Sequence, residues 1–150
     1  MPNWCSNKIA VSGDLTKFKT WLNGEPLTLN KIVPMDQALL EDDWSWYDWR
    51  IENWGTKWDV EATAEDLGDT IIFSFRSAWA PPIIVFAKLA ESFPEIKIVH
   101  SYLEEGMCFV GKVTYTRGYK TGELFYEDPA QQEWKELATA EFDWEPYTEE

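Results

Sequence analysis

Apolar and polar residues alternate along three short stretches of the chain, at residues 5–12, 57–63 and 96–103. A period of two is typical of a strand with one buried face, so each stretch predicts a strand. Residues 70–76 are rich in Ile and Phe, and a turn at residues 66–69 joins them to the second stretch as a hairpin. The pattern therefore predicts four core strands.

Apolar residues at helical spacing separate these strands. Residues 15–23 follow Asp14, a residue type that caps helices, and they carry one apolar stripe. Pro81 and Pro82 open a second, well-buried helix that runs through Phe93. The order strand, helix, strand, strand, helix, strand is that of the split βαβ, or ferredoxin-like, arrangement.

Three further stretches surround this ferredoxin-like core. Residues 27–33 predict a short strand or an ordered loop. Residues 107–116 predict a long strand with a bulge at Gly111, against which residues 119–126 pair back. A last helix is expected to begin at residues 128–131, which hold a capping Asp, a Pro and a Gln.

These elements predict one α+β domain over residues 1–150, with an antiparallel sheet and two helices on one of its faces. Residues 35–56 form an acidic, tryptophan-rich insertion that is partly helical. Residues 107–150 form a C-terminal extension made of a hairpin and a helix. At 17.5 kDa the chain can bury a core without disulfides or a structural metal.

Negative charge is concentrated in two blocks of a chain whose net charge is −14. Residues 35–70 hold eleven acidic and two basic residues, and residues 123–150 hold ten acidic and one basic. Binding a nucleic-acid strand needs Lys and Arg, so this charge opposes direct contact with nucleic acid. No apolar run reaches the roughly 20 residues that cross a bilayer, and residues 1–15 lack a secretory pattern, so we expect a cytoplasmic protein.

The acidic blocks have two interpretations. Acidic side chains keep a protein soluble. Carboxylates on one strand face also recur at roughly 6.6 Å, near the spacing of DNA phosphates, and could dock on a basic protein as a DNA mimic. The residues that would supply charge to such a partner-binding surface are Glu41, Asp42, Asp43, Asp48, Asp59, Glu61, Glu133, Glu136, Glu141, Asp143 and Glu145.

Tryptophans lie among the acids of the insertion. Trp44, Trp46 and Trp49 cannot all face one side of a helix or a strand. We therefore expect some of them to stay exposed and to anchor a partner inside a polar rim. Packing against the core is the alternative role, and stacking on a sugar or a base is another, although the acidic neighbours would repel a nucleic-acid strand.

Few other residues offer candidate chemistry. His100, the only histidine, shares a strand face with Tyr102 and Glu104 and could act as a general base, although a packed, hydrogen-bonded role is typical of such a residue. Cys5 and Cys108 could meet as a redox pair or pack as small hydrophobes. The acids lack a glycine-centred calcium loop, and two cysteines cannot hold an iron–sulfur cluster. We predict no metal, no cofactor and no catalytic residue.

Short sequence islands add a resemblance to a known family. The first is Pro2–Asn7 (PNWCSN), and the most specific is residues 52–59 (ENWGTKWD). The others are Trp79, Pro81, Pro82 and Phe86, then Phe93-Pro94, then Tyr102, Glu104, Gly106 and Gly111. In these islands the chain resembles the YubB-type ferredoxin-like domain family of phages, plasmids and other mobile elements. The resemblance implies the fold and a mobile-element origin in a bacterial host, and it carries no catalytic residue to this sequence.

Together these features predict a non-enzymatic phage or plasmid protein that binds, and inhibits, a basic host protein acting on nucleic acid, such as a nuclease used in defence. One alternative is an accessory or structural domain whose acidity serves only solubility. A second alternative is an enzyme centred on His100.

Overall fold

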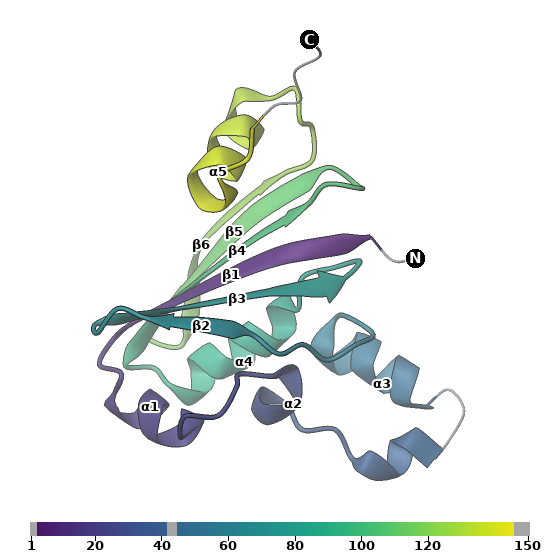
Figure 1. Ribbon diagram of the computed structural model, residues 1–150, viewed down its shortest axis with the longest axis vertical. Helices are drawn as coiled ribbons and strands as arrows, with labels where there is room; N and C mark the ends of the chain where they lie inside the picture. Colours follow the sequence, from purple (N-terminus) through teal and green to yellow (C-terminus); the bar gives the residue numbers. More distant parts are fainter. Residues whose placement is uncertain (1–2, 42–44, 146–150) are drawn as a thin grey trace.

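The computed structural model describes residues 3–41 and 45–145, which build a six-stranded antiparallel sheet with helices on both faces (Figure 1). The strand order is β2-β3-β1-β4-β5-β6, so β1 lies inside the sheet between β3 and β4. The strands are β1 (Trp4–Gly13), β2 (Thr63–Asp66), β3 (Thr70–Ala78), β4 (Ile96–Glu104), β5 (Phe109–Thr116) and β6 (Tyr119–Tyr126).

The helices divide unequally between the two faces of this sheet. They are α1 (Thr16–Leu22), α2 (Leu29–Ile32), the 3-10 helix η1 (Gln37–Glu41), α3 (Ser45–Trp54), α4 (Ile83–Ser92) and α5 (Gln132–Phe142). Helices α1 to α4 lie on one face, and α5 lies on the other (Figure 1). The order β1-α1-β2-β3-α4-β4 confirms the predicted ferredoxin-like fold, which β5, β6 and α5 extend. Among the described residues, no helix is long and apolar enough to cross a membrane.

The main core lies between the sheet and helices α1 to α4. Alternate residues of β1, such as Ile9 and Val11, are fully buried there, as the period of two predicted. Phe73 of β3 lies opposite Ile9, and the ring of Phe18 from α1 packs edge-on against it at 6.0 Å between centroids. Burying one such side chain stabilises a fold by about 1.5–3 kcal/mol, so these contacts fix which sheet face the helices cover.

A smaller core joins α5 to the opposite sheet face. Trp134, Leu137 and Ala138 of α5 are buried against Leu103 of β4 and Val110 of β5. The indole Nε1 of Trp134 also donates a hydrogen bond to the carbonyl oxygen of Cys108, at 3.0 Å. The C-terminal helix is therefore docked, and it covers only the β4–β5 part of its sheet face.

The alternation at residues 57–63 does not form a strand, because β2 begins only at Thr63. The carboxylate of Asp59 instead accepts hydrogen bonds from the backbone N–H groups of Leu29, at 2.7 Å, and Asn30, at 3.3 Å. Those residues begin helix α2, which replaces the strand or loop predicted for residues 27–33. Asp59 thus satisfies donors that a helix start leaves free, which holds the two segments together.

Gly111 does not form the predicted bulge. It pairs in register with Tyr102 of β4, and the irregularity of the β5–β6 pairing falls between Thr114 and Tyr115. A Cβ atom at position 111 would collide with the ring of Tyr102. The glycine therefore leaves room for the tyrosine side chain on the same sheet face.

The last helix begins three residues later than the sequence predicted, at Gln132, because its N-cap is Gln131 and not Asp128. The side chain of Asp128 accepts a hydrogen bond from the N–H of Ala130 at 3.0 Å, and its carbonyl accepts one from the N–H of Gln131. These contacts form a turn ahead of the helix, so Asp128 caps that turn and the predicted capping box does not form.

Candidate functional site

Helix α3 holds the acidic insertion firmly against the domain. The indole of Trp54 is buried and donates a hydrogen bond to the carbonyl oxygen of Val33 at 2.9 Å. Trp49 meets Trp54 edge-on at 5.5 Å between ring centroids, and Trp46 is half-buried against the main core. Trp46 and Trp49 therefore pin α3, and a direct role for them in partner binding stays a prediction. Three predicted residues lie outside the described part of the chain: Asp42, Asp43 and Trp44.

The outward face of α3 combines apolar and acidic side chains. Tyr47 and Ile51, one helical turn apart, are 36% and 43% exposed. Asp48 and Glu52, also one turn apart, are exposed beside them, and neither forms an ion pair within the described residues. Tyr47 and Ile51 were not among the predicted anchors, although their four-residue spacing was the signal that could have found them.

Arg50 does not neutralise this face, because its side chain turns inward. Its guanidinium lies over the rings of Trp46 and Trp54, at about 5 Å from each centroid. It also donates a hydrogen bond from Nη1 to the carbonyl oxygen of Lys57 at 3.2 Å. Glu41, at the end of η1, is exposed and lies in the segment that leads to α3. Among the described residues of the insertion, Glu41, Asp48 and Glu52 are therefore exposed and form no ion pair with Arg50.

The two acids predicted to act from one strand, Asp59 and Glu61, have separate environments. The carboxylate of Asp59 accepts hydrogen bonds from backbone N–H groups, that of Val60 at 2.7 Å and those of Leu29 and Asn30 in α2. Glu61 is exposed, and an isolated bridge joins its residue to Thr28. Residues 57–62 are not a strand, so strand geometry does not set the spacing of the two carboxylates.

The second acidic block lies on and around α5. Its exposed acids include Glu133, Glu136, Asp143 and Glu145. Glu141 differs, because its carboxylate forms ion pairs with Lys8 at 2.6 Å and Lys112 at 2.9 Å. Burial tends to raise the pKa of this carboxyl, but hydrogen bonds and charges of the two lysines outweigh that effect and lower the pKa. Glu141 therefore fastens α5 to the sheet.

Helices α3 and α5, which carry acids of the first and the second block, lie on opposite faces of the sheet. Helix α3 packs with α4 on one side, whereas α5 covers β4 and β5 on the other (Figure 1). Glu61 of the first block is an exception, because it lines one hollow with Glu141 of the second. A partner that contacts one flat face can therefore engage the acids of α3 or those of α5, and not both. Within residues 3–41 and 45–145, α3 is the helix that combines exposed acids with an exposed apolar pair.

Comparisons with known proteins agree with this architecture. The family model described as the ferredoxin-like domain in Api92-like protein matches residues 53–143, which is more than half of the chain and includes β5, β6 and α5. The chain belongs to this family. A solved structure, the protein Api92 from Yersinia pseudotuberculosis, matches with a TM-score of 0.54 and 19% identity. The match covers 67% of this chain and 39% of that one, and at this identity it shows the fold alone. A search of curated proteins found no match.

In this Api92-like domain the single histidine is part of the core. His100 is fully buried, burial lowers its pKa to about 3, and its Nε2 lies 2.8 Å from Oδ1 of Asn7. Glu104, its predicted neighbour, is also buried and accepts hydrogen bonds from the N–H groups of Gly106 and Met107. Both side chains therefore serve the fold, and neither faces a solvent-accessible substrate position.

The two cysteines are both free. Cys5 is buried, and burial, followed by the charge of Glu104, raises the pKa of its thiol to about 12. A thiol of that pKa is protonated at neutral pH and reacts poorly as a nucleophile. Cys108 is half-buried and contacts the carbonyl oxygen of Glu105 at 3.4 Å. Within residues 3–41 and 45–145, no group of three or more His, Cys, Asp and Glu side chains is placed to hold a metal ion.

Proposed function

We propose that this domain is a non-enzymatic protein that captures a basic macromolecule through the outer face of α3. The observation that carries the proposal is the exposed apolar pair Tyr47 and Ile51 beside the exposed acidic pair Asp48 and Glu52. Exposed apolar side chains supply the area that a partner buries, and the carboxylates favour a partner that presents Lys and Arg around that contact.

Rigid attachment of α3 supports this role. Trp49 and Trp54 pack against each other on the inner side of α3. The guanidinium of Arg50 lies over the rings of Trp46 and Trp54 on the same side of the helix. A face that is already ordered loses little conformational entropy on binding, so more of its contact energy contributes to affinity. The tryptophans thus contribute indirectly, because they orient the neighbouring exposed residues.

The charge of the insertion defines the partner's chemistry. Asp36, Glu41, Asp48 and Glu52 are exposed along η1 and α3, and the cation of this segment, Arg50, is turned inward. Such a field attracts a positively charged surface over about 10 Å at 0.1 M ionic strength, and salt weakens the attraction. Association with the partner is expected to be fast and salt-dependent.

We take the partner to be a host protein that acts on nucleic acid, and the consequence of capture to be its inhibition. Proteins that hold a polyanion present the basic surfaces that this face would meet. The resemblance to a family of mobile elements supports the same role, since phages and plasmids benefit from blocking host nucleases. The geometry favours capture by one patch over imitation of a long DNA strand, because Asp59 and Glu141 are bonded internally and the other acids divide between two sheet faces.

The test compares two variants with the same change of charge. Asp48→Asn/Glu52→Gln neutralises the α3 face, and Glu133→Gln/Glu136→Gln removes two charges from α5 on the other side of the sheet. A protein captured from bacterial lysate at low salt is identified, purified and titrated against the parent and both variants. We expect a basic nucleic-acid-acting protein, about tenfold weaker binding to the α3 variant, which corresponds to about 1.4 kcal/mol, and unchanged binding to the α5 variant.

Two outcomes would contradict the proposal. Equal losses in both variants would show that overall charge, and not the α3 face, governs binding. Unchanged binding to the α3 variant, or capture of no basic protein, would favour the accessory domain whose acidity serves solubility. Circular dichroism of each variant confirms that the fold is intact.

A further inference from the structure

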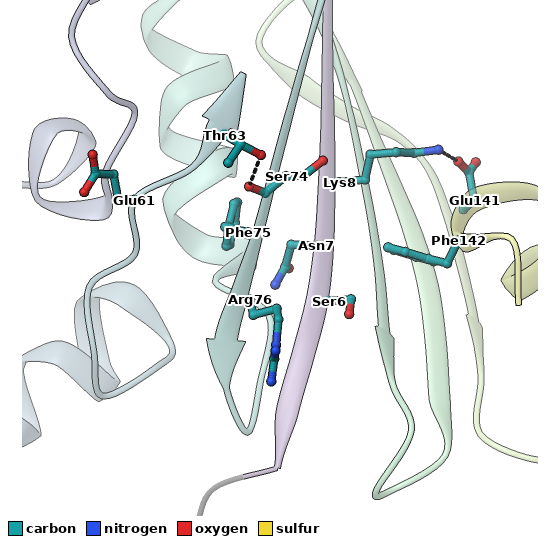
Figure 2. A pocket seen from close by; sticks show the side chains of 10 residues that line it. All are labelled: Ser6, Asn7, Lys8, Glu61, Thr63, Ser74, Phe75, Arg76, Glu141 and Phe142. Atoms are coloured by element: carbon teal, nitrogen blue, oxygen red, sulfur yellow. Dashed lines mark hydrogen bonds and ion pairs between the residues drawn. The ribbon is translucent and has the colours of Figure 1, made fainter. Parts of the chain in front are cut away.

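Part of the sheet face that carries α5 is left uncovered, on the side of the sheet opposite to α3. Helix α5 covers β4 and β5, and between α5 and β2 the surface of β1 and β3 forms a hollow of about 440 Å³ (Figure 2). Ligand pockets for small molecules span about 300–1,000 Å³, so the hollow has room for one small molecule. Residues that line it include Ser6, Lys8, Thr63, Ser74, Arg76 and Phe142.

The floor of the hollow carries polar groups on a largely apolar surface, because the strand register brings hydroxyls and cations together. Ser6 lies opposite Arg76, Lys8 lies opposite Ser74, and Ser74 in turn lies opposite Thr63. Directly opposed side chains on one sheet face lie about 5 Å apart at Cβ. Figure 2 shows Ser6 and Lys8 on the α5 side of β1, with Phe142 reaching toward them from α5. The floor therefore offers hydroxyl and cationic donors within one small area.

A second hollow, of about 370 Å³ and lined by Trp4 and Arg76, adjoins the first one at Arg76, which lines both. Trp4, at the start of β1, is 39% exposed, and the guanidinium of Arg76 lies over its ring at 5.1 Å from the centroid. Trp58, also 39% exposed, lies 5.9 Å from Trp4, and Nζ of Lys57 lies 4.4 Å from the centroid of Trp58. The two indoles thus contact each other beside Arg76, and each carries one cation over its ring.

The local charge is more positive than that of the whole chain. Arg76 forms no ion pair within the described residues, so its guanidinium edge is available to an anion. Lys8 and Lys112 share the single carboxylate of Glu141, which leaves one positive charge over. Glu61 at the rim is the opposing charge. The hollow therefore offers hydrogen-bond donors and positive charge to a small anion, although the protein carries a net charge of −14.

We propose that this hollow binds a nucleoside monophosphate. The phosphate lies against the guanidinium of Arg76 and the hydroxyls of Ser6 and Ser74, because Arg matches a phosphate with two parallel hydrogen bonds. The base stacks on the indole of Trp4, a contact that every nucleobase can make. A single nucleotide fits better than a strand, because the volume suits one unit and the net charge repels a chain of phosphates.

The test titrates the domain by calorimetry with each of AMP, GMP, CMP and UMP, and then with inorganic phosphate, adenosine and a short oligothymidylate. Two variants address the site, Arg76→Gln and Trp4→Leu, both at exposed side chains. Lys97→Gln is the matched control, since Lys97 is exposed on β4 and pairs with Ser12, at the far end of β1 from Trp4. The proposal expects saturable mononucleotide binding, about tenfold weaker in each site variant and unchanged in the control.

Each other result overturns the inference in a distinct way. If inorganic phosphate binds as tightly as the nucleotides, the base contributes nothing to affinity and has no place in the site. If the oligothymidylate binds more tightly than UMP, the ligand is a nucleic-acid strand and not a mononucleotide. An equal loss of nucleotide affinity in Lys97→Gln would show that overall charge, and not this site, causes the effect. An absence of saturable binding would show that the hollow is not a nucleotide site. The Asp48→Asn/Glu52→Gln variant should bind nucleotide like the parent, so this test does not depend on the α3 proposal.

Discussion

His100 donates a 2.8 Å hydrogen bond from Nε2 to Oδ1 of Asn7 inside the main core. The direction of the bond follows from the other contacts of Asn7, whose Nδ2 donates to the carbonyl of Cys5 and to Oγ of Ser77. Ser77 in turn donates to the carbonyl of Ala80, so it accepts from Asn7. Oδ1 of Asn7 is left as an acceptor, and His100 must carry its proton on Nε2.

The lowered pKa of His100 predicts that the fold becomes less stable in acid. Burial lowers its pKa to about 3 from an ordinary value of 6.5, so between these values the unfolded chain binds a proton that the folded chain does not. The free energy of unfolding should therefore fall as pH decreases from 6.5 toward 3, by up to about 1.4 kcal/mol per pH unit from this group. His100→Gln keeps a donor for Asn7 but cannot titrate. Urea unfolding at pH 7, 6, 5 and 4 should give a shallower pH dependence for the variant, and parallel curves would contradict the assignment.

Gly111 and Tyr102 should be energetically coupled. A Cβ at position 111 meets the ring of Tyr102, so Gly111→Ala is expected to lower the free energy of unfolding by about 1–3 kcal/mol through overpacking. In a Tyr102→Leu background the end of the ring is gone, and the same substitution should cost much less. Thermal unfolding of the two single variants and the double variant measures this coupling. Additive losses would show that the contact does not limit position 111.

The sequence was sufficient for elements whose pattern is local. Strands β1 and β4 follow directly from a period of two, because Ile9 and Ile98 each face the same buried layer as the residues two positions away. Helix α4 follows from its continuous apolar character and its proline start. In each case the burial that stabilises the element is encoded within a few neighbouring residues.

Features that depend on distant contacts could not be predicted in this way. The alternation at residues 57–63 resembles a strand, but the position of Asp59 is decided by the N–H of Leu29, thirty residues earlier in the chain. Likewise, Trp49 is half-buried because it meets Trp54, whose own place depends on Val33. The spacing of Tyr47 and Ile51 places them on one side of α3, but the packing of the tryptophans decides that this side faces outward.

Asp59 should be a strong contributor to stability despite its partly exposed position. Its carboxylate receives hydrogen bonds from Leu29, Asn30 and Val60, so Asp59→Ala leaves backbone donors at the start of α2 without a partner. The expected loss in the free energy of unfolding is about 1–2 kcal/mol, the usual effect of removing a helix cap. Asp69→Ala, in the β2–β3 turn, is the control and should change stability by less than about 0.5 kcal/mol. Urea unfolding followed by tryptophan fluorescence measures both, and equal small effects would rule out the capping role.

Glu141 should stabilise the docking of α5 in a pH-dependent way. Its pKa is lowered in the folded state by Lys8 and Lys112, so its contribution is present above the ordinary glutamate pKa of about 4.5 and is lost as pH falls through the lowered pKa. At pH 7, Glu141→Gln should reduce the free energy of unfolding by about 1–3 kcal/mol, because two lysines lose a charged acceptor. Glu136→Gln, on the outer face of α5, is the control and should have little effect. Chemical unfolding across a series from pH 7 downward should show the gap between the Glu141 variant and the parent narrowing in acid, and a gap that stays constant throughout would show that packing rather than charge is responsible.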